Sequence, residues 1–253
     1  MVKSTANWRQ IAKDLIRSFG FEVRRIPRFA AGRIPVEEIH PYADYAPWLR
    51  DDAFLTVHEK IRHHTLVDRY RCWELWTLVP EVRSVPGILL EVGVWRGGTG
   101  VLLAYRAQQL GMDSPIYLCD TFRGVVKASQ NDPFYKGGEH ADASPEIVED
   151  LAERLGVAGI KILPGIFPDE TGPLLPPEPI RLCHIDVDTH DSAADCFRWV
   201  WPRLSPGGIV VFDDYGFSQC SGLASFVDGL RGQPGRVVVH NLNGHALVIK
   251  TGE

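Results

Sequence analysis

The sequence predicts an α/β protein whose sheet is mostly parallel and is covered by helices on both faces. From residue 88 onward, short runs of β-favouring apolar residues alternate with segments of helical composition, which is the pattern of such a sheet. A glycine-rich turn over residues 93–98 joins the first strand to the first helix of this region. Carboxylates follow several of the strands. Because ligands bind at the carboxyl ends of the strands in sheets of this kind, we expect the functional site at that edge.

The individual elements are placed by their apolar runs and by the glycines and prolines that interrupt them. The turn Pro206-Gly207-Gly208 precedes the fifth strand, and residues 241–244 form a turn between the last two strands, which we expect to pair antiparallel. The expected strands cover residues 88–93, 116–120, 160–165, 180–186, 209–214, 236–240 and 246–250, and the expected helices cover residues 98–110, 145–155, 192–204 and 222–230.

Two further segments precede the sheet. Residues 1–50 are expected to form a basic amphipathic helix and a linker, because apolar side chains recur there at helical spacing: Trp8, Ile11, Leu15 and Phe19. Such a helix can bind weakly to an anionic membrane surface, but we favour packing on the main domain or on a second subunit and expect a homo-oligomer. Residues 51–85 are predicted to form a helical cap, and residues 86–253 the main domain.

The composition argues against several classes of protein. A net charge of −5 argues against a nucleic-acid-binding surface. The five cysteines are scattered and none belongs to a C-x-x-C pair, so neither a zinc ribbon nor a disulfide framework is indicated. The sequence contains no signal-peptide pattern and no apolar run of membrane length, and we therefore expect a cytoplasmic protein.

The glycine-rich turn has the features of a ligand-binding loop. Its glycines allow a sharp turn and a close approach of the backbone to a ligand, and the helix that follows offers unpaired N–H groups. We expect Glu91 to accept hydrogen bonds from a cationic ligand and Asp120 to accept the hydroxyls of a ribose. The spacing is not G-x-G-x-x-G, so the dinucleotide fingerprint is absent. The alternative is a turn that serves packing alone.

Four aspartates lie at or just after the ends of two of the predicted strands: Asp186, Asp188, Asp213 and Asp214. Carboxylates brought together repel one another, and a divalent cation relieves that conflict. Oxygen-only ligands favour Mg²⁺ or Ca²⁺ over zinc. The alternative is a set of helix caps and loop charges.

Several motifs occur in order along residues 87–253: Glu91–Thr99, Asp120-Thr121-Phe122, Gly165–Thr171, His184–Asp188 and Leu204–Gly208 through Asp213-Asp214-Tyr215. Together they resemble the macrocin O-methyltransferase family, which includes enzymes that methylate sugar hydroxyls in antibiotic biosynthesis. The resemblance implies a Rossmann-like class I S-adenosylmethionine-dependent fold, with a seven-stranded sheet whose last strand is antiparallel. It also implies a Mg²⁺-assisted transfer of a methyl group to a small sugar-containing substrate, with residues 86–253 as the catalytic domain.

The same resemblance implies roles for individual residues. Asp186, Asp213 and Asp214 would hold the metal, and Asp188 would be the base. The resemblance does not extend to His190, but because it lies two residues beyond Asp188 we expect it to assist as a base or to contact the acceptor; the alternative is a partly exposed cap residue. The residues implied to bind the cofactor are Glu91, Gly93, Val94, Trp95, Arg96, Gly98, Thr99, Asp120, Thr121, Gly165, Ile166 and Asp186.

The chain departs from the family pattern in three places. Val187 stands where the family commonly has Gly, Thr189-His190 where it has Leu-Tyr, and Arg123-Gly124-Val125 where it has Glu-Gly-Phe. Residues 123–143 are expected to form a lid, with Tyr135, Lys136 and His140 near the acceptor or facing solvent. Two alternatives for the function stay open, an NAD-dependent oxidoreductase on a similar fold and a non-catalytic binding module.

Overall fold

The computed structural model describes residues 15–16, 18–19, 35–39 and 43–252. The chain divides into two compact units, residues 1–40 and 41–253, and the description that follows concerns the second. Most of the predicted amphipathic helix, including Trp8 and Ile11, lies outside the described residues.

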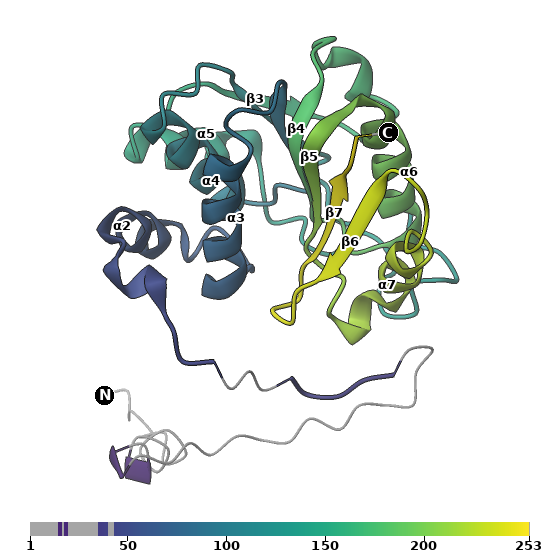
Figure 1. Ribbon diagram of the computed structural model, residues 1–253, viewed down its shortest axis with the longest axis horizontal. Coiled ribbons are helices and arrows are strands. Elements are labelled where there is room, and N and C mark those ends of the chain that lie inside the picture. The colour runs from purple at the N-terminus through teal and green to yellow at the C-terminus, as the bar shows by residue number, and fades with distance from the viewer. Residues whose placement is uncertain (1–14, 17, 20–34, 40–42, 253) are drawn as a thin grey trace, which may run out of the picture. The chain divides into compact units, whose positions relative to one another are not determined.

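The centre of the second unit is a seven-stranded sheet with the strand order β3-β2-β1-β4-β5-β7-β6 (Figure 1). The neighbouring strands from β3 to β5 pair parallel, whereas β7 pairs antiparallel with both β5 and β6. This confirms the predicted sheet, including its antiparallel last strand. The strands are β1 (Ile88–Val92), β2 (Ile116–Asp120), β3 (Ile160–Pro164), β4 (Ile180–Ile185), β5 (Leu204–Phe212), β6 (Arg236–His240) and β7 (Ala246–Lys250).

Helices cover both faces of the sheet, which divides the core in two. Alternate residues of each strand enter opposite halves, so that Leu89 packs with the helices of one face and Leu90 with those of the other. On one face lie α2 (Asp52–Ile61), α3 (Arg69–Glu81), α4 (Gly98–Gln109) and α5 (Pro145–Arg154), and on the other α6 (His190–Val200) and α7 (Ser221–Asp228) (Figure 1).

The two largest differences from the predicted boundaries concern the end of α6 and the start of β5. The α6 helix ends at Val200 and a 3₁₀ turn over Trp201–Arg203 follows, since Pro202 has no backbone N–H with which to continue the α-helical hydrogen bonds. The β5 strand begins at Leu204 and runs through the expected Pro-Gly-Gly turn, because Leu204 pairs with Ile180 ahead of a register shift. None of the described helices is both long and apolar enough to cross a membrane.

Candidate active site

A cavity of about 290 Å³ lies at the carboxyl ends of the central strands, at the edge that the sequence indicates. Its floor is formed by the residues that follow β1, β2, β4 and β5. The cap contributes residues 65–67 and Arg71 to its wall, and the segment after β2 contributes Tyr135 and His140. Because Gly98 N donates to His64 O at 2.8 Å, the loop between α2 and α3 is fixed over the glycine-rich turn.

The glycine-rich turn has a backbone that only glycine can provide at its first position. Gly93 has a φ of +87°, and a Cβ there would lie 1.7 Å from the carbonyl oxygen of Asp186. The next two amides, Val94 N and Trp95 N, donate to Asp120 Oδ2 at 2.6 and 2.8 Å. Phe122 N donates to the other carboxylate oxygen at 2.6 Å. Asp120 therefore joins the turn after β1 to the loop after β2, and keeps part of its accepting capacity.

The predicted cofactor-binding residues divide into two groups. Arg96 is held outside the cavity by Asp142, whose carboxylate and carbonyl oxygens it binds at 2.7 and 3.0 Å. Glu91 is completely buried, and its Oε1 lies 2.8 Å from His184 Nδ1. Its side chain thus lies in the protein interior and not on the cavity wall, whereas the sequence-based prediction places it against a ligand. Those that line the cavity are Gly93, Val94, Trp95, Thr99, Asp120, Thr121, Gly165 and Asp186; Glu91, Arg96, Gly98 and Ile166 do not.

Asp186, Asp213 and Asp214 lie together on the cavity floor. Each offers one carboxylate oxygen to a group whose atoms all lie within 4.8 Å of one another. Burial, together with the neighbouring carboxylates, raises the pKa of both Asp186 and Asp214. This all-oxygen donor set fits a hard divalent cation, which would relieve the repulsion between the carboxylates.

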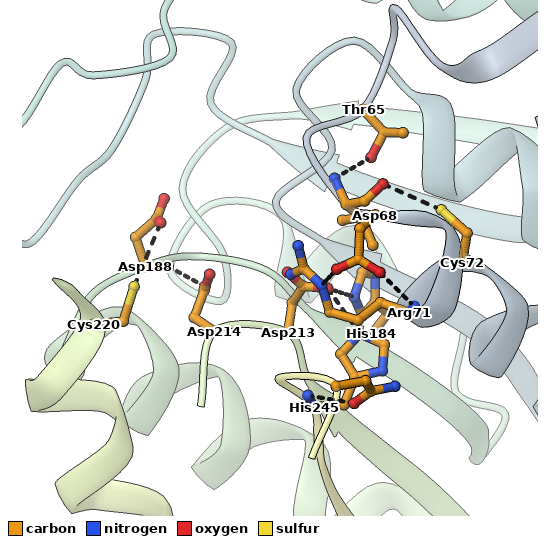
Figure 2. A network of polar contacts seen from close by, with 12 residues as sticks. Thr65, Asp68, Arg71, Cys72, His184, Asp188, Asp213, Asp214, Cys220 and His245 are labelled. Atoms are coloured by element: carbon orange, nitrogen blue, oxygen red, sulfur yellow. Dashed lines mark hydrogen bonds and ion pairs between the residues drawn. The ribbon is translucent and has the colours of Figure 1, made fainter. Parts of the chain in front are cut away.

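Asp213 is the best-supported carboxylate of the group (Figure 2). It accepts hydrogen bonds from His245 Nε2 at 2.8 Å and from His184 Nε2 at 3.3 Å, and it is paired with the Arg71 guanidinium. Burial alone would raise the pKa of Asp213, but these partners outweigh it and lower the pKa. In the same way, burial lowers the pKa of His184, but its hydrogen bonds with Asp213 and Glu91 raise it to about 10.

Asp188 lies beside this cluster and has a left-handed backbone, with a φ of +64°. Its amide donates to Asp214 Oδ2 at 2.9 Å (Figure 2), and its Oδ1 accepts from the Tyr135 hydroxyl at 2.5 Å. Burial raises the pKa of Asp188, and the hydrogen bond from Tyr135 partly opposes that shift. A partly buried carboxylate with a raised pKa at a cavity wall has the properties of a general base.

His190 lies away from this position. Its Nδ1 is 2.7 Å from Asp191 Oδ1, its ring packs edge-on against Phe226, and it does not line the cavity. The α6 helix begins at this residue, and the structure places its side chain against α7 and not on the cavity wall, so the catalytic role expected for His190 stays a prediction. Of the three residues singled out in the lid, Tyr135 and His140 line the cavity, whereas Lys136 does not.

Sequence reasoning missed the supporting residues of Asp213. Arg71 and Glu74 lie one turn apart on α3, and His245 directly precedes β7. The sequence offers two signals, a histidine within the apolar run of β4 and charged side chains within the α3 helix. Neither signal identifies Asp213 as the partner of these side chains.

A sheet of this order, with an antiparallel last strand and a cavity at the strand ends, defines the class I methyltransferase fold. The chain belongs to the macrocin O-methyltransferase family, whose model matches residues 59–234. Among solved structures, the O-methyltransferase NovP matches with a TM-score of 0.66 and 24% identity, covering 75% of this chain and 83% of that one. The O-methyltransferase TomG from Streptomyces achromogenes, solved in complex with S-adenosylmethionine, matches with a TM-score of 0.54 and 18% identity, covering 80% and 91%.

Two curated relatives are similar at the level of sequence. Mycinamicin III 3''-O-methyltransferase of Micromonospora griseorubida is 31% identical over 175 residues, which are 62% of this chain and 67% of the relative. The 8-demethyl-8-(2,3-dimethoxy-alpha-L-rhamnosyl)-tetracenomycin-C 4'-O-methyltransferase of Streptomyces olivaceus is 31% identical over 169 residues, which are 62% of this chain and 64% of the relative. The match thus spans about two thirds of the length of these relatives.

Proposed function

We propose that this protein transfers the methyl group of S-adenosylmethionine to a sugar hydroxyl, assisted by Mg²⁺. The observation that carries the proposal is the position of Asp188 beside an all-oxygen carboxylate cluster, in the cavity that also contains the glycine-rich turn. The name of the Streptomyces olivaceus relative, a rhamnosyl 4'-O-methyltransferase, supports a sugar hydroxyl as the acceptor.

The cofactor would be held by the turn after β1 and by the loops after β2 and β3. Val94, Trp95 and Asp120 are fixed to one another by hydrogen bonds, so this part of the cavity is organised before a ligand enters. The loop over residues 65–67 covers the turn from the side of the cap and would keep water out. When bound there, S-adenosylmethionine supplies a methyl group that its sulfonium has already activated.

Asp186, Asp213 and Asp214 would hold the divalent cation. A bound Mg²⁺ supplies a Lewis acid that lowers the pKa of an acceptor hydroxyl. The protein contributes the position of the carboxylates: Asp213 is fixed by Arg71 and two histidines, and Asp214 by the amide of Asp188.

Asp188 would act as the general base. It takes the proton that leaves the acceptor hydroxyl while the new carbon–oxygen bond forms and the carbon–sulfur bond breaks, with the electron pair of that bond passing to sulfur. The products are the methyl ether, S-adenosylhomocysteine and a protonated Asp188, which returns its proton to water. Tyr135 binds Oδ1 of Asp188, so Oδ2 is the oxygen left to receive the proton.

The remaining parts of the proposal rest on the sequence. We propose that the enzyme acts in the cytoplasm as a homo-oligomer on a small molecule and not on nucleic acid. Its basic amino-terminal segment would contact another subunit, or weakly a membrane surface.

Methyl transfer tests this function directly. The full chain is incubated with methyl-labelled S-adenosylmethionine and a panel of nucleotide sugars and glycosylated natural products, with either MgCl₂ or EDTA. Label in a sugar ether that appears only with MgCl₂ supports the proposal. Label transfer that is equal in EDTA argues against the metal, and label on a non-sugar oxygen argues against the acceptor class.

A further inference from the structure

The carboxylate of Asp213 receives donors from three separate elements (Figure 2). Oδ1 accepts from His245 Nε2 at 2.8 Å and from His184 Nε2 at 3.3 Å, whereas Oδ2 is paired with Arg71 Nη1. Arg71 lies on α3 and His184 on β4, and His245 lies in the turn between β6 and β7, directly before β7. The cap, the sheet centre and the last hairpin therefore all meet at one side chain.

Each of these donors is itself held by another acid. His184 Nδ1 lies 2.8 Å from Glu91 Oε1, His245 Nδ1 lies 2.5 Å from Glu74 Oε2, and Arg71 Nε donates to Asp68 Oδ2 at 2.8 Å. Both histidines are completely buried. Each histidine ring therefore contacts a carboxylate through both of its nitrogens, and neither ring can rotate without breaking two contacts.

A carboxylate has about four accepting positions, two on each oxygen. The two histidines occupy both positions on Oδ1 of Asp213, and Arg71 occupies one on Oδ2. We propose that Arg71, His184 and His245 are positioning residues, which restrict Asp213 to donating a single oxygen, Oδ2, to the divalent cation. This inference rests on the proposed function, because it concerns the cation assigned there.

The consequence is a preference among cations. Mg²⁺ requires an octahedral shell and takes one oxygen from a carboxylate, whereas Ca²⁺ takes six to eight ligands and accepts both oxygens of one carboxylate. A site in which Asp213 offers only Oδ2 disfavours Ca²⁺. Removing a histidine frees an accepting position on Oδ1 and gives the Asp213 side chain more freedom to rotate. Both oxygens of Asp213 can then bind the cation.

The test uses two substitutions of one histidine. In His245→Gln the side-chain amide can replace Nε2 and still donate to Asp213. In His245→Asn the amide replaces Nδ1 and reaches only Glu74. Asn241 and Asn243 also donate to Glu74, so that acid keeps partners in both variants. Mn²⁺ binding to the full chain is measured by electron paramagnetic resonance, Ca²⁺ binding by competition with Mn²⁺, and S-adenosylhomocysteine binding by calorimetry as a check on folding.

For His245→Asn we expect Mn²⁺ affinity to fall by about tenfold, as for other residues that orient a metal ligand, and the ratio of Ca²⁺ to Mn²⁺ affinity to rise. For His245→Gln the Mn²⁺ affinity and the ratio of Ca²⁺ to Mn²⁺ affinity should both stay within about threefold of the native values, a smaller change than the one expected for His245→Asn. Should either variant fail to bind S-adenosylhomocysteine, the same pair of substitutions at His184 provides the comparison.

Three results would overturn the inference. The first is a His245→Asn variant that binds S-adenosylhomocysteine, Mn²⁺ and Ca²⁺ as the native protein does. The second is an equal loss of Mn²⁺ affinity in the Asn and Gln variants. The third is zinc that copurifies with the native protein and is absent from His245→Asn, because the histidines would then be metal ligands. If the native protein binds no divalent cation at all, it is the metal in the proposed function that fails.

Discussion

The hydroxyl of Tyr135 lies 2.5 Å from Oδ1 of Asp188, so the segment that covers the cavity donates a hydrogen bond to the residue proposed as the base. Tyr135 is itself almost fully buried, and its hydroxyl is 3.8 Å from Cys220 Sγ. The segment is held in place by paired backbone bonds, from Val125 N to Glu139 O at 2.8 Å and from Gly138 N to Val125 O at 2.9 Å. The orientation of Asp188 therefore depends on the segment over residues 123–143.

Replacing Tyr135 with Phe should lower kcat by roughly 10- to 150-fold, since a hydrogen bond to a charged group contributes roughly 1.5–3 kcal/mol. The KM for the acceptor should change little, because the aromatic ring that lines the cavity is retained. Steady-state kinetics with a saturating cofactor measure both values. Phe134→Leu, at an exposed neighbouring position, is the control. An unchanged kcat in Tyr135→Phe would show that Asp188 does not need this donor.

Asp188→Asn should reduce turnover by at least about 100-fold, because the amide cannot take the proton. Its affinity for S-adenosylhomocysteine should stay within about twofold, since the substitution is isosteric and removes no donor from the turn after β1. Asp191→Asn, which lies outside the cavity wall, controls for charge. Normal turnover in Asp188→Asn would exclude this residue as the base.

The two groups of predicted cofactor residues can be told apart by mutation. Asp120→Ala leaves Val94 N and Trp95 N without their acceptor and should weaken S-adenosylhomocysteine binding by at least about tenfold. Arg96→Ala should leave that affinity nearly unchanged, because Arg96 is bound to Asp142 outside the cavity. Calorimetric titration of both variants with S-adenosylhomocysteine measures the two affinities. A larger loss in Arg96→Ala than in Asp120→Ala would reverse the assignment.

The turn itself can be tested through stability. Gly93→Ala places a methyl group 1.7 Å from the carbonyl oxygen of Asp186 at a φ of +87°, and should cost about 3 kcal/mol or more in free energy of unfolding. Gly111→Ala has a similar positive φ of +64° but no atom within 4 Å of the added methyl, and should cost about 1–2 kcal/mol. Urea unfolding measures both. Equal losses would mean that the close approach to β4 is unimportant.

Much of this architecture could be predicted because it depends on local pattern. The runs around Leu90 and Val210 identify the strands, and the carboxylates that end them must meet at one sheet edge once the strands are parallel. The contact of Arg71 with Asp213 joins residues 142 positions apart, and it depends on how α3 packs beside the sheet. No local pattern encodes such a contact.

The positions of Glu91 and His190, which lie off the cavity wall, have a related explanation. Glu91 lies in a strand buried on both faces, so its side chain enters the interior between the sheet and α4, where the ideal Cβ of Gly100 would lie 2.5 Å from its Oε2. The side-chain direction of His190 depends on where α6 begins, and helix boundaries are the part of a sequence prediction with the largest error.

The central claim is that the cavity at the strand ends binds S-adenosylmethionine beside a divalent cation. Calorimetric titration of the full chain with S-adenosylhomocysteine, with and without Mg²⁺ and followed by sugar acceptors, tests it most directly. We predict micromolar binding of S-adenosylhomocysteine in both conditions and an acceptor that binds only when Mg²⁺ is present. Absence of S-adenosylhomocysteine binding in every condition would contradict it.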